Sequence, residues 1–153
     1  HLSVARRFFD VKGDGIELHK ADAADWVNSH RGPVFDMIID DVFADYDGET
    51  QRAVTADNAW VNKLSSLLGS DGMIVSNFAT RLELDVSAYL PSKQSRKRFS
   101  SAVMLSTAQN YNAVGVFARR HITSRQLRAR LKAIPSLDPR KSAGACYRIR
   151  TLY

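Results

Sequence analysis

Acidic and amide side chains stand at the ends of three short runs of apolar or alternating residues. Asp22 follows the first run, Asp40 and Asp41 end the second, and Asn77 lies near the end of the third. A carboxylate in such a position can bind an ammonium group and take its proton, which is the chemistry of a general base. Each residue also has an ordinary structural use. Asp22 suits a helix N-cap, one of the paired carboxylates could bind loop amides, and Asn77 could close a turn.

The elements that must position these side chains alternate between strands and helices. Strands are expected over residues 16–21, 35–39 and 73–78, and helices after Asp22 and from an N-cap at Thr55 to a glycine at 69. This order is typical of a parallel sheet covered by helices. Ligands bind at the carboxyl ends of the strands in such sheets, so the polar residues are expected on one edge.

The second half of the chain is expected to complete the sheet. Residues 80–98 are predicted to be mostly helical, residues 101–106 and 113–118 to form an antiparallel pair of strands at the sheet edge, and residues 124–132 to form a basic helix. The prediction is therefore an α/β domain over residues 1–135, with a basic C-terminal tail over residues 136–153.

Charge and composition bear on three possibilities: nucleic-acid binding, a disulfide or zinc site, and a membrane span. The net charge is +6, but residues 1–91 carry a net −7 and residues 92–153 a net +13. The basic half could contact nucleic acid, although Phe99 and Tyr111 alone do not make a base-stacking platform, so a solvated helix face is favoured. One cysteine excludes an intrachain disulfide and a Cys-rich zinc site, and no apolar run reaches the ~18–20 residues of a membrane span. A cytoplasmic domain without a metal is expected.

Three motifs occur in a familiar order. They are Ala21-Asp22-Ala23, the run from Phe35 to Phe43 that contains Ile39-Asp40-Asp41, and the run from Leu67 to Asn77 that contains Gly72-Met73-Ile74-Val75. Together they resemble the spermidine synthase-like branch of the class I S-adenosylmethionine-dependent methyltransferase fold. The resemblance runs from about Val4 to Arg119. It implies a Rossmann-like, mostly parallel sheet that lacks the family's glycine-rich first strand and the ribose-binding acid of its second strand.

The resemblance also implies roles for individual residues. Asp22 would accept a hydrogen bond from the adenine amino group, with the Ala23 amide and Asp40 also at the nucleoside. Asp41 matches the aspartate that helps deprotonate the attacking amine. The family continues with Ser-Ser-Asp-Pro, whereas this chain continues with Val-Phe-Ala-Asp, so the second amine-binding acid is expected at Asp45 or Asp47. The co-substrate would be S-adenosylmethionine or its decarboxylated form, and the acceptor a small-molecule amine of polyamine biosynthesis.

Two other functions fit the same residues. A methyltransferase on this fold would use S-adenosylmethionine and act on a small molecule or on RNA. A non-catalytic interaction module would instead form homo-oligomers through the sheet edge that the missing strands leave open, because an uncovered apolar edge invites pairing.

Overall fold

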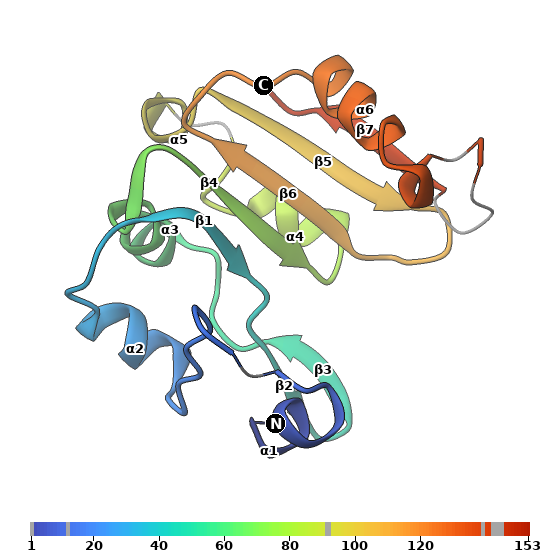
Figure 1. Ribbon diagram of the computed structural model, residues 1–153. Helices are drawn as coiled ribbons and strands as arrows, with labels where there is room; N and C mark the ends of the chain where they lie inside the picture. The colour runs from blue at the N-terminus through green and yellow to red at the C-terminus, as the bar shows by residue number, and fades with distance from the viewer. Residues whose placement is uncertain (1, 12, 91–92, 139, 142–145) are drawn as a thin grey trace. The chain divides into compact units, whose positions relative to one another are not determined.

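The computed structural model describes residues 2–11, 13–90, 93–138, 140–141 and 146–153. It divides into two compact units, residues 1–31 and 32–153. The first unit contains helices α1 (Leu2–Phe8) and α2 (Ala23–Ser29), and the second contains the sheet and the remaining elements (Figure 1).

The first unit is built around helix α2. Asp22 caps this helix, because its Oδ1 accepts hydrogen bonds from the backbone N–H of Ala24 at 2.8 Å and of Asp25 at 3.1 Å. The Trp26 ring of this helix lies 4.8 Å, centroid to centroid, from the ring of His30, the residue that follows the helix. The strand expected over residues 16–21 is not formed. A strand needs a hydrogen-bonded neighbour, and the described part of this unit contains no other strand.

The second unit contains a five-stranded mixed sheet. Its strands are β1 (Phe35–Asp40), β4 (Leu68–Phe78), β5 (Ser101–Thr107), β6 (Ala113–Ala118) and β7 (Tyr147–Thr151), in the spatial order β1-β4-β6-β5-β7. The β1–β4 pair is parallel, and the β4–β6, β6–β5 and β5–β7 pairs are antiparallel. The α/β class is confirmed, but the sheet is mixed and not mostly parallel.

Two expectations about the end of the chain need correction. Strands β5 and β6 pair as predicted, but β6 is inserted between β4 and β5, so the pair does not form the edge. The segment expected to be a basic tail contains the short 3-10 helix Pro135–Leu137 and strand β7, which pairs with β5. Ile149 explains this strand, because it is buried between two exposed arginines and so alternates as a half-buried strand does.

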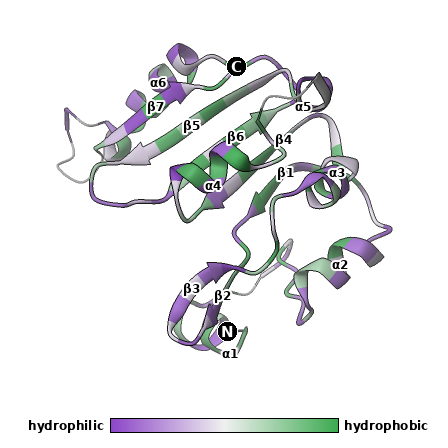
Figure 2. Ribbon diagram, turned by 180° about the vertical axis from the view of Figure 1, so that it is seen from behind, coloured by the Kyte–Doolittle hydropathy of each residue, from purple (hydrophilic) through white to green (hydrophobic). Residues whose placement is uncertain are grey.

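The second unit also contains four short α-helices within its described residues. They are α3 (Asn58–Ser66), α4 (Arg81–Val86), α5 (Lys93–Arg98) and α6 (Ser124–Lys132). Helix α6 has the predicted bounds, and Thr123 and Gln126 form a capping box at its start. Helix α3 begins after Asp57 and not after Thr55, and Gly69 belongs to strand β4 and does not end the helix. In Figure 2, hydrophobic residues concentrate on strands β1, β4, β5 and β6, whereas β7 is mostly hydrophilic.

Aromatic side chains fill the core on one face of the sheet. Tyr89 and Phe117 are fully buried and stacked, with centroids 4.0 Å apart, and the Phe78 and Phe99 rings lie within 6.1 Å of Tyr89. A Cβ atom at Gly115 would lie 2.6 Å from the Phe117 ring. Glycine at this position therefore makes room for the aromatic stack.

The loop expected after β1 is a β-hairpin. Strands β2 (Phe43–Tyr46) and β3 (Glu49–Arg52) pair in register around a two-residue turn. Asp47 and Gly48 have φ angles of 54° and 84°, the positive values of a type I′ turn. Among the described residues, no helix is both long enough and apolar enough to cross a membrane.

Candidate functional site

A chain of three polar side chains lies at the carboxyl ends of β1 and β4. The Asn77 Nδ2 donates to Oδ1 of Asp41 at 3.0 Å, and the Asn112 Nδ2 donates to Oδ1 of Asn77 at 3.0 Å. The predicted gathering of Asp41 and Asn77 at one sheet edge is confirmed. Asp41 is exposed, and only one of its two carboxylate oxygens takes part in this chain, so the other can bind a ligand.

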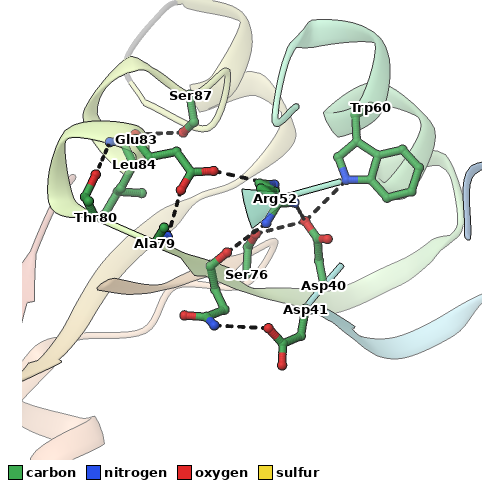
Figure 3. Close-up of polar contacts among 11 residues, drawn as sticks. Asp40, Asp41, Arg52, Trp60, Ser76, Ala79, Thr80, Glu83, Leu84 and Ser87 are labelled. Carbon is green, nitrogen blue, oxygen red and sulfur yellow. Dashed lines mark hydrogen bonds and ion pairs between the residues drawn. The ribbon is translucent and has the colours of Figure 1, made fainter. Parts of the chain in front are cut away.

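Asp40, the neighbour of Asp41, points into the protein. It is 2% exposed, and its Oδ2 accepts hydrogen bonds from Arg52 Nη2, from Ser76 Oγ at 2.8 Å and from Trp60 Nε1 at 3.3 Å (Figure 3). The expected role of Asp40 at the nucleoside is therefore corrected: it is the acid of a buried ion pair. Consecutive side chains of a strand point to opposite faces, which explains why the two carboxylates have different surroundings.

Arg52 connects this ion pair to the sheet edge. Its Nη1 donates to the backbone carbonyl of Asn77 at 2.7 Å, and its guanidinium carbon lies 5.4 Å from the centroid of the Phe78 ring. Glu83 contributes a weaker contact, with its Oε1 3.9 Å from Arg52 Nε. Arg52 is the last residue of strand β3. The end of the hairpin is therefore hydrogen-bonded to Asn77, the residue whose side chain orients Asp41.

The phenol of Tyr89 is buried, and the charges of Asp40 and Arg52 both act on it. Burial raises the pKa of Tyr89 well above its ordinary value, and the negative charge of Asp40 adds to this effect. The phenol is therefore neutral over the whole physiological pH range, and it supplies no general base to the edge.

A cavity adjoins the polar edge. It has a volume of about 260 Å³, and Asn112 lines it together with Asn110 and Thr107. Its apolar lining comes from the strands, α6 and the C-terminal segment: Leu105, Val114, Leu131, Leu137 and Tyr147.

The remaining predicted site residues have local structural roles. Asp45 accepts a hydrogen bond from the Gly48 N–H at 2.8 Å, and Asp47 occupies the turn itself. Asp45 lies on strand β2, which belongs to the separate two-stranded sheet and not to the five-stranded one. Asp22 caps α2, and Ala23 is the first residue of that helix.

Sequence reasoning missed Arg52 and Asn112. Asp47-Gly48 is the signal that could have revealed Arg52, because a two-residue turn fixes the hairpin register and returns residue 52 to the level of residue 43. Asn112 immediately precedes a predicted strand that runs antiparallel to β4, so its position at the same edge follows once that pairing is known.

Comparison with family models, with curated proteins and with solved structures gives no match. The described residues also contain no group of three or more His, Cys, Asp or Glu side chains that could hold a metal ion.

Proposed function

We propose that this chain is a spermidine synthase-like transferase domain that moves an aminopropyl group from decarboxylated S-adenosylmethionine to a small amine. The single observation that carries the proposal is the exposed carboxylate of Asp41, which Asn77 orients at the carboxyl edge of the sheet. Strand β6 lies next to β4, and Asn112, the residue before β6, donates a hydrogen bond to Asn77 at this edge.

In the proposed reaction, Asp41 binds the protonated amine and accepts its proton. The freed nitrogen lone pair attacks the carbon attached to the sulfonium. A C–N bond forms as the C–S bond breaks, and methylthioadenosine leaves with the electron pair on its sulfur. The Asn77 amide fixes one carboxylate oxygen, so the other is held in position for the amine. The sulfonium is its own leaving group, so catalysis consists mainly of alignment and proton removal.

Asp22 and Ala23 are the proposed contacts for adenine. A carboxylate has about four acceptor positions, and the two amides that Asp22 caps both use Oδ1. Its capping role therefore leaves acceptor capacity for the adenine amino group.

The test is an assay of methylthioadenosine release from decarboxylated S-adenosylmethionine in the presence of a diamine. Asp41→Asn should lower the rate by about 10²–10⁴-fold, because it removes a proton acceptor and keeps the shape of the side chain. Asp71→Asn is the matched control and should leave the rate within about twofold of the unmodified chain, because Asp71 is exposed near the start of β4, away from the carboxyl end of that strand. Equal rates for the unmodified chain and Asp41→Asn would contradict the proposal. Methyl transfer from S-adenosylmethionine would identify the methyltransferase alternative.

A second function, an interaction module, is favoured by strand β1. In the described part of the chain β1 ends the sheet, and two of its apolar side chains are exposed, Met37 by 52% and Ile39 by 67%. An open strand edge with apolar side chains can pair with a second copy of the chain. This reading predicts a dimer in sedimentation that Ile39→Lys dissociates, and no transfer activity. A monomer at micromolar concentration would contradict it.

A further inference from the structure

Strand alternation leaves one face of the sheet apolar and incompletely covered. On β4, Ile74 and Phe78 are fully buried, whereas Met73 and Val75 point to the opposite face and are half-buried. Val116 is paired with Val75 across the β4–β6 ladder. The half-buried side chains of β4, together with Val116 of β6 and Leu105 of β5, line a cavity of about 600 Å³.

Helix α6 and the loop before it supply the rest of the cavity lining. Ile122 and Leu127 add apolar surface, and Arg120, His121, Gln126 and Arg130 add polar groups. On α6, residues 126 and 130 are four positions apart, and residues 127 and 130 are three apart. This spacing places them on one side of the helix, which faces the cavity. The side chain of Gln126 is already engaged, because its Oε1 accepts from the Thr123 N–H at 2.9 Å.

The two arginines of this lining have no acidic partner among the residues that the structure describes. Among the described contacts, neither Arg120 nor Arg130 forms an ion pair or a hydrogen bond with a carboxylate. The one acid after residue 91 is Asp138, and it pairs with Arg140 at 2.9 Å. Within the part of the chain that the structure describes, no ion pair therefore neutralises either guanidinium.

We propose that this cavity binds a small organic anion with an apolar body, such as an aromatic carboxylate, sulfonate or phosphate ester. The volume lies within the range of small-molecule sites, roughly 300–1,000 Å³. The apolar strand residues would contact the body of the ligand, and the guanidinium groups of Arg120 and Arg130 would bind its anionic group through charge-assisted hydrogen bonds. This site does not depend on the proposed transferase activity, and none of its lining residues is a proposed catalytic or adenine contact.

A pair of fluorescent probes tests the charge requirement directly. 1-Anilinonaphthalene-8-sulfonate is an apolar aromatic anion, and N-phenyl-1-naphthylamine has the same aromatic body without the sulfonate. Titration of the folded chain should give saturable binding of the sulfonate probe, with weaker binding of the neutral probe. Absence of saturable sulfonate binding would overturn the proposal.

Variants then locate the site. Arg130→Gln and Arg120→Gln should each weaken sulfonate binding roughly fivefold, and the double variant roughly twentyfold, with the neutral probe changed by less than about twofold. Arg125→Gln is the matched control, because Arg125 lies on the same helix but does not line the cavity. Equal weakening in the Arg125 variant, or unchanged sulfonate binding in the double variant, would overturn the assignment of the site. Circular dichroism of each variant confirms that the helix remains folded.

Discussion

Replacing Arg52 with glutamine removes the cation from a buried ion pair. The side chains of Arg52 and Asp40 are only 5% and 1% exposed, so water cannot solvate the carboxylate that is left behind. Removing one partner from such a pair costs about 3–5 kcal/mol. Domains typically unfold with a free energy of about 5–15 kcal/mol, so this loss is a large fraction of the total.

The assay is urea unfolding followed by circular dichroism. With a slope of about 2 kcal/mol per molar urea, a loss of about 4 kcal/mol lowers the midpoint by about 2 M. Arg81→Gln is the matched control, because Arg81 pairs with Asp85 at 2.7 Å but both side chains are more than a third exposed. That exposed pair should contribute less than about 0.5 kcal/mol.

A double-mutant cycle shows whether the pair itself causes the loss. Asp40→Asn keeps an acceptor for Trp60 and Ser76 but removes the charge, and the double variant with Arg52→Gln has neither charge. The double variant should be less destabilised than the sum of the two single variants by about 2 kcal/mol or more. Additive losses, within about 0.5 kcal/mol, would refute the interpretation of Asp40 as a paired structural acid.

Three further outcomes follow from the geometry. Gly115→Val should lower the free energy of unfolding by about 1–3 kcal/mol, measured by thermal melting, because its side chain would collide with the Phe117 ring. Burial raises the pKa of Tyr89, so the unfolded chain loses this proton first. Stability should therefore fall above about pH 10 by up to ~1.4 kcal/mol per pH unit, and Tyr89→Phe should remove that slope in urea titrations at high pH. Asp22→Ala should destabilise helix α2 by about 1 kcal/mol, and Asp22→Asn, which can still cap, by only a few tenths, as measured by chemical unfolding.

Elements with strong local signals could be predicted from the sequence. Residues 113–118 and 124–132 form β6 and α6 with the expected bounds. For β6, a run of apolar and β-branched residues favours a strand. For α6, Thr123 is a good N-cap, and Leu127 and Leu131 follow at the four-residue spacing of a helix. The strand expected over residues 16–21 failed because alternation alone does not supply a pairing partner.

The sheet order required information that no single segment contains. Strand β7 pairs with β5 although the paired residues are forty or more positions apart in the sequence, and β6 inserts between β4 and β5. Such pairings depend on how several apolar faces are buried together. Local propensity in the C-terminal segment, with its alternating arginines, did not reveal them.

The candidate site was also predicted only in part, because some of its contacts join segments that are far apart in the sequence. Asp41 and Asn77 follow neighbouring parallel strands, so their meeting at one edge could be expected, and the structure confirms it. The sequence did not distinguish Asp40 from Asp41 as the buried acid. That difference depends on Arg52, which the hairpin returns to Asp40 from twelve residues along the chain.

The central claim is that this chain binds a nucleoside derived from S-adenosylmethionine. The most direct measurement is calorimetric titration of the purified chain with methylthioadenosine, S-adenosylmethionine and decarboxylated S-adenosylmethionine, repeated with Asp22→Asn. We expect the decarboxylated compound to bind more tightly than S-adenosylmethionine. We also expect a roughly 10- to 100-fold loss of affinity in the variant, because it keeps the helix cap but loses a charged acceptor. No binding of any of the three compounds, or equal binding by the variant, would contradict the account.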